Sequence, residues 1–318
     1  MHISLRLLRY FVAAAETGST TAAARALNVS QPSISVAIRE LESVFNEALF
    51  TRGLGSGLIA TQFGERKLSE ARQLLAVAAA FEADDGGNAA AGEVRLGVFT
   101  TIAPVYLPSL LRIAQQRYPK LSIRCEEGDL AQLESRLQSH RIDLALTYDV
   151  GLPAGIEREC LADLKPHALI PAGSRLGKTR GPVSLRQLVK EPFILIDLPY
   201  SREFLLAPFW QYGLSPEVRY RVASIELARA MVAEGLGVTL LITQKSATMH
   251  TPTLVERPIR EETVRQPLVI ARAAQALHTR ASQLVAECIH AAVQETLVRR
   301  SGRPRTGETP IAAPGQPR

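Results

Sequence analysis

The sequence predicts an α/β protein in which a small all-α unit and a long linker helix precede a larger domain. From residue 93 onward, short apolar runs alternate with helical stretches, which is typical of sheets covered by helices. Residues 1–61 carry apolar side chains at helical spacing, and residues 62–81 contain no proline and one glycine. These observations divide the chain into an N-terminal unit (1–61), a linker helix with a hinge (62–92), a C-terminal domain (93–298) and a tail (299–318).

The composition is that of an ordinary soluble globular protein, with 46% hydrophobic and 21% charged residues in a chain of 318. No run of about 18 apolar residues occurs, so no membrane span is expected. The apolar start of the chain is followed by Glu16 and has helical periodicity, which favours a folded helix over a secretory signal. We therefore expect a cytoplasmic protein without a membrane partner.

The net charge of +6 does not locate a nucleic-acid-binding surface, because residues 296–318 carry +4 of it. This tail is rich in Pro, Gly and Arg and is predicted to be disordered. A DNA-binding surface must therefore be identified from the pattern of residues.

No metal site, cofactor or enzymatic activity is expected. Cys125, Cys160 and Cys288 lie far apart and form no CxxC pair, so buried free thiols are the simplest interpretation. The six histidines are scattered, and the chain contains no GxSxG, GxGxxG, HExxH or Walker sequence.

The first 45 residues predict three short helices. Apolar residues at helical spacing begin at Leu5, and Gly18 follows where the first helix should stop. A second helix should start at the N-cap Ser19 and end near Asn28, which tolerates a left-handed conformation. A third should be capped by Ser30, with Pro32 in its first turn.

The third helix has two different faces. Ile34, Ile38 and Leu41, with Phe45, form one apolar stripe, and the opposite face carries Pro32, Val36, Arg39 and Ser43, flanked by Ser33 and Ser35. Two helices joined by a short turn, the second with a small polar outer face, are typical of the helix-turn-helix, whose second helix enters the major groove. The side chain of Gln31 could make a bidentate contact with adenine. A surface helix with a solvated polar face would show the same pattern.

The segment after this helix indicates a small wing. Gly53, Gly55, Gly57 and Gly64 surround a short apolar stretch, as in a hairpin beside the third helix. Arg52 at its entrance could neutralise a phosphate, a contact that positions the protein without specifying sequence.

Residues 1–82 resemble the N-terminal region of LysR-type transcriptional regulators. The resemblance runs through LRLLRYFVAAAETGSTTAAARALNVSQPSISVAIRELE, then LFTR, then T-x-x-G at Thr61 and Gly64. It implies that double-stranded DNA is the partner, and that these residues face it: Gln31, Pro32, Ser33, Ser35 and Arg39, with Arg52 on the backbone. RNA polymerase is a further candidate partner.

This sequence departs from the family pattern at two places. Val36 stands where the family often has Arg or Lys, and Phe45-Asn46 replaces the usual Leu-Gly. The first change removes a polar contact and leaves methyl groups suited to a thymine methyl. The second is mild, because Asn also accepts a left-handed conformation.

The linker predicts a helix of about 20 residues, roughly 30 Å long. Leu68, Ala71, Leu75 and Ala78 form a narrow apolar seam, and residues 83–92 suggest a hinge. The resemblance implies antiparallel self-association through residues 62–81, as a homodimer or as a homotetramer. Such pairing would present two recognition helices to two half-sites.

The C-terminal domain predicts eight strands and five helices, which suggest largely parallel sheets. The expected strands are 93–99, 121–127, 143–148, 167–172, 193–197, 217–222, 237–242 and 267–272. The expected helices are 105–117, 129–139, 201–212, 225–234 and 277–298.

This region resembles the LysR-family effector domain, which is similar in fold to periplasmic solute-binding proteins. The resemblance implies two crossovers, near 161–165 and 264–268. Lobe I would combine 93–161 with 268–298, and lobe II would be 165–264. A ligand between the lobes could then change the arrangement of the DNA-binding heads.

Candidate effector contacts follow the expected strands, because such folds bind ligands at strand C-terminal ends. Thr100 and Thr101 precede a helix whose N-terminus favours an anion, so the expected effector is an anionic organic acid. The other candidates are Gly128, Tyr148, Tyr200, Ser201 and Ser224. Ordinary loop or capping roles remain open for all of them.

Two alternative functions are a thiol-redox-sensing regulator of the same family and a solute-binding protein. The first requires a reactive cysteine near the cleft, and residues 197–213 contain none. The second should carry an export signal in place of residues 1–82.

Overall fold

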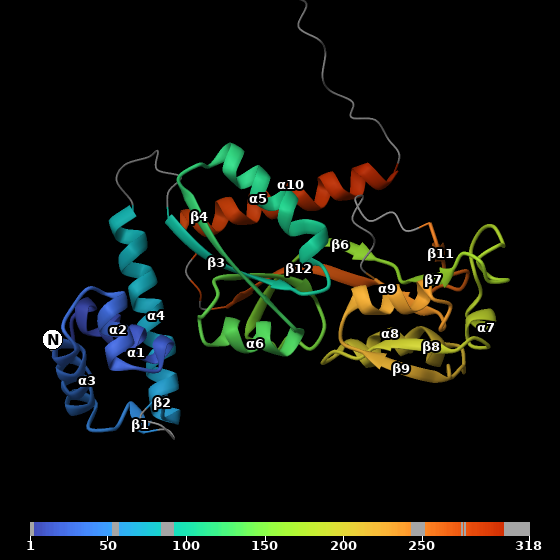
Figure 1. Ribbon diagram of the computed structural model, residues 1–318. Helices are drawn as coiled ribbons and strands as arrows, with labels where there is room; N and C mark the ends of the chain where they lie inside the picture. The colour runs from blue at the N-terminus through green and yellow to red at the C-terminus, as the bar shows by residue number, and fades with distance from the viewer. Residues whose placement is uncertain are drawn as a thin grey trace, which may run out of the picture.

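The computed structural model describes residues 3–52, 57–83, 92–242, 252–274, 276 and 278–301. The wing tip (53–56), most of the expected hinge (84–91) and the tail beyond Ser301 therefore lie outside the described residues. A small N-terminal head, one long helix and two α/β lobes follow one another along the molecule (Figure 1). The α/β fold class and the preceding all-α winged helix-turn-helix are confirmed.

The head contains the three predicted helices: α1 (Leu5–Thr17), α2 (Thr20–Ala26) and α3 (Gln31–Phe45). The side chains of Ser4, Ser19 and Ser30 each accept a hydrogen bond from a backbone N–H of the helix that follows. Gly18 ends α1 in the left-handed region with a φ of 62°, where glycine carries no steric penalty. Hydroxyl caps and this glycine therefore set the helix boundaries.

The wing is a hairpin of β1 (Phe50–Arg52) and β2 (Leu58–Ala60), paired antiparallel. The backbone N–H of Leu58 donates to the carbonyl oxygen of Gly18 over 2.8 Å, which fixes the wing against the end of α1. The next helix, α4 (Gln62–Ala83), starts beside the wing. The Thr61 hydroxyl accepts a hydrogen bond from the Gly64 N–H and donates to the Ala48 carbonyl oxygen.

Most of the seam predicted on α4 packs against the head itself, since Leu68, Ala71 and Leu75 all contact its core. Leu68 and Ala71 are buried against α1 in the core of the head. The exposed apolar side chains of α4 lie one position away and are Leu74 (52% exposed), Val77 (45%) and Phe81 (83%). The seam prediction is therefore corrected to a stripe at 74, 77 and 81, since its first turns stabilise the head itself.

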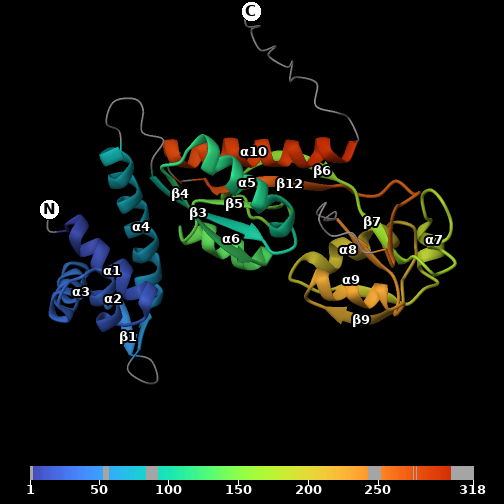
Figure 2. The same ribbon diagram turned by 45° about the horizontal axis from the view of Figure 1, so that its top comes forward.

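Lobe I is built on a five-stranded sheet in the order β4-β3-β5-β12-β6. Its strands are β3 (Gly92–Phe99), β4 (Leu121–Gly128), β5 (Leu144–Tyr148), β6 (Ile156–Leu164) and β12 (Gln266–Ala273). Its helices are α5 (Ala103–Arg117), α6 (Leu130–Gln138) and α10 (Arg280–Ser301). Helices α5 and α10 lie side by side over one face of this sheet (Figure 2).

Lobe II contains three strands in the order β10-β7-β11 and a parallel pair, β8-β9. A bridge from Phe193 to Val238 joins the two groups. The strands are β7 (His167–Pro171), β8 (Phe193–Ile196), β9 (Val218–Val222), β10 (Thr239–Leu241) and β11 (Leu254–Pro258). The helices are α7 (Leu185–Leu188), α8 (Ser201–Gln211) and α9 (Ile225–Ala233).

Three expectations about the C-terminal domain need correction. The five-stranded sheet is mixed, because β12 runs antiparallel to both β5 and β6, and the β10-β7-β11 sheet is antiparallel throughout. Strands β6 and β11 and helix α7 were not predicted. Because β6 pairs with β12 from Leu164 to Ile156, lobe I extends to Leu164 and resumes at Gln266.

The middle of α4 contacts lobe I at the end of α6 and just beyond it. The Ser69 hydroxyl lies 3.4 Å from the carbonyl oxygen of Gln138, and Gln73 Nε2 lies 2.6 Å from His140 Nε2. The linker helix is therefore in contact with the head along its first turns and with lobe I further on.

Candidate DNA-binding surface and effector cleft

The outer face of α3 is the candidate DNA-binding surface. Ile34, Ile38 and Leu41 are buried in the head, whereas Gln31, Pro32 and Arg39 are exposed and Ser35 is half-buried. Val36 is 52% exposed and presents its methyl groups outward. The hydrogen-bonding side chains therefore face away from the head's own core.

A chain of hydrogen bonds orders this surface. The Gln31 amide donates to the Thr20 hydroxyl over 3.1 Å and to the Ser35 hydroxyl over 2.8 Å. Arg39 Nε in turn donates to the backbone carbonyl oxygen of Ser35 over 3.3 Å. Thr20, at the first position of α2, was not predicted. Its contact with Gln31 depends on how α2 and α3 pack, which spacing along the chain does not reveal.

Two of the predicted DNA contacts, Ser33 and Arg52, differ from the exposed residues of α3. The Ser33 side chain is half-buried, and its hydroxyl lies 2.8 Å from that of Ser30, the α3 N-cap. Ser33 thus contributes to the start of the helix. The backbone of Arg52 pairs with Leu58 in the wing, but its side chain lies outside the described residues, so its phosphate contact stays a prediction.

The candidate effector site is a cavity between the lobes. Of the seven residues predicted to contact the effector, Thr101, Tyr148, Tyr200 and Ser201 line it. Lobe I also contributes Phe99, Leu130, Val150 and Gln266. Lobe II also contributes Ile196, Phe204, Leu205, Ile225, Leu240, Leu241 and Ile242.

Thr100, Gly128 and Ser224 do not line this cavity, and their contact with an effector stays a prediction. The Thr100 N–H donates to the Gly128 carbonyl oxygen over 3.1 Å, which ties the ends of β3 and β4 together. The Ser224 hydroxyl accepts a hydrogen bond from the Leu227 N–H and caps α9. Both arrangements serve local backbone structure, as capping and turn residues commonly do.

Basic side chains near the cleft are paired with an acid. Arg202 donates two hydrogen bonds to Asp197, over 2.9 and 3.1 Å, and Arg221 donates a third over 3.0 Å. The hydrogen bond from Arg202 is the main cause that lowers the pKa of Asp197 below its ordinary value. The Arg202 guanidinium is therefore held by the protein's own carboxylate.

The two lobes touch directly at the cleft. Tyr200 of lobe II lies against Gly151 of lobe I, where an added Cβ would be 3.1 to 3.2 Å from ring carbons of the tyrosine. Both residues have left-handed backbones, with φ of 64° and 69°. The lobes are thus closed at this point, and only a glycine permits so close an approach.

The cysteines are dispersed over lobe I. Cys125 lies in β4 and Cys160 in β6, the two opposite edges of the five-stranded sheet, and Cys288 is buried in α10. Burial raises the pKa of the Cys125 and Cys288 thiols. Across the described residues, no group of three or more His, Cys, Asp or Glu side chains is placed to hold a metal ion, and no helix there is long and apolar enough to cross a bilayer.

Comparison with known proteins agrees with this architecture. Residues 5–65 match the family model "Bacterial regulatory helix-turn-helix protein, lysR family", and residues 87–294 match "LysR substrate binding domain". The Escherichia coli protein YnfL, an uncharacterized HTH-type transcriptional regulator, is 32% identical over 248 residues, covering 76% of this chain and 82% of its own. A probable hydrogen peroxide-inducible genes activator from Mycobacterium leprae is 34% identical over 242 residues, covering 74% and 76%.

A solved structure extends this similarity to the fold. HinK, a LysR family transcriptional regulator from Pseudomonas aeruginosa, is 36% identical, with a TM-score of 0.60 over 90% of this chain and 97% of its own. Two family models in the expected order, relatives of this identity and the observed architecture lead to one conclusion: the chain belongs to the LysR family of transcriptional regulators.

Proposed function

We propose that this regulator binds double-stranded DNA through the outer face of α3 and adjusts that binding to a small molecule held between the lobes. The observation that carries the proposal is the exposure of Gln31 and Arg39 on a helix whose opposite face anchors the head. Small residues between them let a helix approach base edges in the major groove. Because DNA is the partner, cytoplasmic residence is part of the proposal.

Individual roles follow from the chemistry of each side chain. Gln31 and Arg39 offer hydrogen bonds to base edges, Ser35 adds a hydroxyl, and Val36 offers methyl groups for a thymine. Pro32 and Ser33 hold the start of α3 close to the duplex, and Arg52 supplies charge for the backbone. We infer no enzymatic activity, and a contact with RNA polymerase stays a prediction.

Self-association through α4 is supported by its exposed apolar stripe. Leu74, Val77 and Phe81 lie three and four residues apart, so they share one face of the helix. Pairing two such stripes would remove apolar surface from water, at roughly 25 cal/mol per Å². We therefore propose a dimer through these residues, which would present two α3 helices to two half-sites, with the tetramer as a further prediction.

A footprinting experiment tests this function. The purified chain should protect two half-sites, one helical turn or a multiple of it apart, on DNA upstream of its own gene or of the neighbouring gene. Candidate metabolites should change the protected pattern. If no upstream segment is protected at low salt, the proposal is wrong.

A redox-sensing function is the second candidate, because relatives include a probable hydrogen peroxide-inducible genes activator. The positions of the cysteines count against it here. Cys125 and Cys160 are separated by four strand spacings of about 4.8 Å, roughly 19 Å in total. A disulfide requires Cα atoms within about 7 Å, so the two thiols cannot join within one chain of this structure.

A further inference from the structure

We propose that the effector held in the cleft is a compact, uncharged molecule with an apolar body and one hydrogen-bonding group, and not the organic anion expected from the sequence. This inference rests on the proposed function, since it assigns a chemical class to the ligand of the same cleft. The inference rests on the side chains that line the cavity, on the nearby arginines and on the helix N-termini at the cleft.

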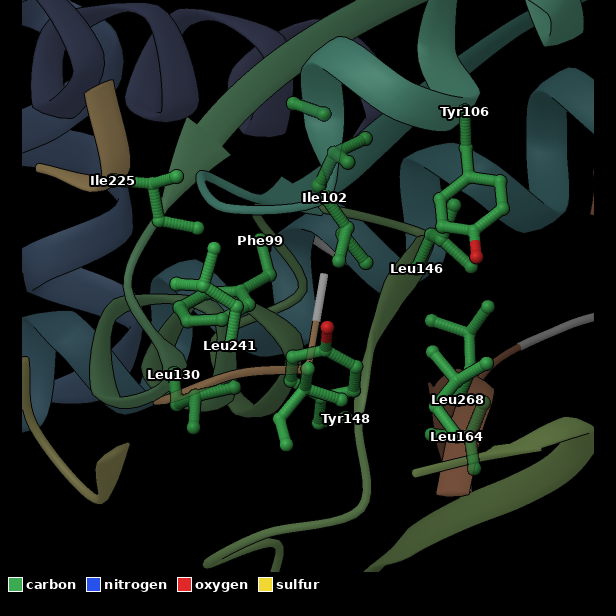
Figure 3. Close-up of a cluster of buried hydrophobic side chains, with 14 of the residues drawn as sticks. Phe99, Ile102, Tyr106, Leu130, Leu146, Tyr148, Leu164, Ile225, Leu241 and Leu268 are labelled. Carbon is green, nitrogen blue, oxygen red and sulfur yellow. The ribbon is translucent and has the colours of Figure 1, made fainter. Parts of the chain in front are cut away.

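The lining is almost entirely apolar. Of its 15 residues, 12 are aliphatic or aromatic, and the other three are the uncharged Thr101, Ser201 and Gln266. No Lys, Arg, His, Asp or Glu is among them. In Figure 3, Phe99, Leu130 and Tyr148 of lobe I lie in one cluster of buried apolar side chains with Ile225 and Leu241 of lobe II.

An ionised carboxylate would lose its hydration in such a cavity and gain no partner of opposite charge. The penalty for such transfer amounts to several kcal/mol per ion unless a cation compensates it. The two arginines near the end of β8, Arg202 and Arg221, lie outside the lining and are both bound to Asp197. Neither guanidinium group is therefore a direct partner for a carboxylate inside the cavity.

The helix N-termini at the cleft do not change this balance. The first turn of α5 contains Pro104, which has no N–H to offer to an anion. The first turn of α8 contains Glu203, a negative charge that interacts with the positive end of the same helix dipole. Both features weaken the local attraction for an anion.

The polar residues suit a single neutral group. Gln266 is buried at the start of β12, and its amide donates to the Pro267 carbonyl oxygen over 3.3 Å. An amide has donor and acceptor atoms, and the hydroxyls of Thr101 and Ser201 can act either way. One hydroxyl, carbonyl or amide on the ligand would find partners there, while its remaining surface meets hydrocarbon, as is usual in ligand pockets.

The cavity has to enlarge to admit such a molecule. Its volume is about 40 Å³, far below the roughly 300–1,000 Å³ of typical small-molecule pockets. The contact between Tyr200 and Gly151 closes its edge. A ligand that separates these two residues would shift the lobes toward a more open state. It changes the equilibrium between closed and open lobes only because it binds the open state more tightly. Binding and lobe movement are therefore coupled.

Matched pairs of neutral and anionic probes test the class. Isothermal titration calorimetry of the full chain at pH 7 would compare benzamide with benzoate, and cyclohexanecarboxamide with cyclohexanecarboxylate. The members of a pair have nearly the same size and shape and differ in charge. The neutral member should bind at least about ten-fold more tightly, a difference of about 1.4 kcal/mol.

Variants connect the binding to the cleft. Val150→Phe fills the lobe I side of the cavity and should abolish binding of the neutral probes, whereas Val264→Phe, at an exposed position outside the lining, should leave it unchanged. Ser201→Phe blocks the cavity from lobe II as a second, independent variant. It decides the test if Val150→Phe melts at a lower temperature than the parent protein.

The outcomes separate the two proposals. Anions that bind as tightly as their neutral partners, and lose binding in both blocking variants, would overturn the chemical class and leave the effector cleft in place. If no neutral probe binds at about 10 mM, or if binding survives both blocking variants, the class assigned to this cavity is wrong. DNA footprinting without any ligand then decides independently whether the DNA-binding proposal stands.

Discussion

Arg72 of α4 donates a hydrogen bond from its guanidinium to the backbone carbonyl oxygen of Ser139 in lobe I over 3.1 Å, although the residues are 67 positions apart. The same side chain, only 4% exposed, lies 3.5 Å from Glu16 Oε1 in α1. Burial lowers the pKa of Arg72, and Glu16 opposes that shift. One side chain thus connects the head, the linker helix and lobe I.

Replacing Arg72 by Ala should loosen the contact between α4 and lobe I. A hydrogen bond from a charged donor contributes about 1.5 to 3 kcal/mol, so amide exchange at residues 138–141 should accelerate by about ten-fold or more. Hydrogen–deuterium exchange with mass spectrometry measures this. Arg66→Ala, an exposed position on the same helix, is the control. Equal exchange in both variants would show that Arg72 does not hold the contact.

The contact between Gln73 and His140 should weaken in acid. The Gln73 amide donates to a neutral imidazole in this arrangement, and burial, followed by the charge of Arg95, lowers the pKa of His140. Asp143 raises this pKa and Arg72 lowers it further. Because the folded state disfavours the proton, the stabilisation is complete above the ordinary histidine pKa of about 6.5 and is lost as the pH falls through the lower folded value.

The pH dependence of the melting temperature measures this effect. His140 has a left-handed backbone, with a φ of 50°, which Asn also tolerates, so His140→Asn is the appropriate variant. The parent should lose more stability than the variant between about pH 7 and pH 5. Parallel curves for the two proteins would rule out His140 as the titrating group.

Gly64→Ala should destabilise the junction between wing and linker helix. An added Cβ would lie 2.0 Å from the carbonyl oxygen of Leu49, which also accepts the Thr61 N–H over 3.0 Å. The backbone must shift, at a cost of about 2–4 kcal/mol, and both the melting temperature and the DNA affinity should fall. Gly155→Ala meets nothing within 4 Å and serves as the control; a Gly64 variant with the control's stability would contradict the expectation.

Peroxide should leave DNA affinity unchanged. Burial raises the pKa of Cys125, which lowers the thiolate fraction that reacts with oxidants. Cys125 and Cys160 also lie too far apart to form a disulfide within the chain. Electrophoretic mobility shifts before and after treatment, with mass spectrometry of the thiols, check both points. A peroxide response that disappears in Cys125→Ser or Cys160→Ser would establish the redox function instead.

The head was largely predictable because its signals are local. Helical spacing alone assigned Ile34 and Leu41 to the core and Arg39 to the surface, and the structure confirms this division. The exposed stripe on α4 differs from the predicted seam because Leu68 packs against α1. That contact joins segments far apart in sequence. Strand β6 was missed for a similar reason: its three consecutive charged residues, 157–159, do not have the alternating pattern of a half-buried strand, and the segment is a strand because it pairs with β12 at the edge of the sheet.

The cleft could be predicted only in part. The rule that parallel strands end on one side of a sheet selected Thr101 and Tyr200, and both line the cavity. The same rule selected Thr100 and Ser224, because it does not tell which way a side chain points. It overlooked Ile225 and Leu241, since an apolar residue that lines a cavity has the same sequence pattern as one in a core.

The most direct test of the central claim is the effect of Arg39→Ala on two kinds of DNA. Affinity for the footprinted operator should fall by about 1–3 kcal/mol, whereas affinity for random duplex DNA should fall much less, because base contacts supply specificity and phosphate contacts do not. Arg117→Ala, which removes an equal and exposed charge from lobe I, should change neither affinity. If Arg39→Ala weakens binding to both DNAs equally, Arg39 touches only phosphate, and the claim that the outer face of α3 recognises sequence through this residue is contradicted.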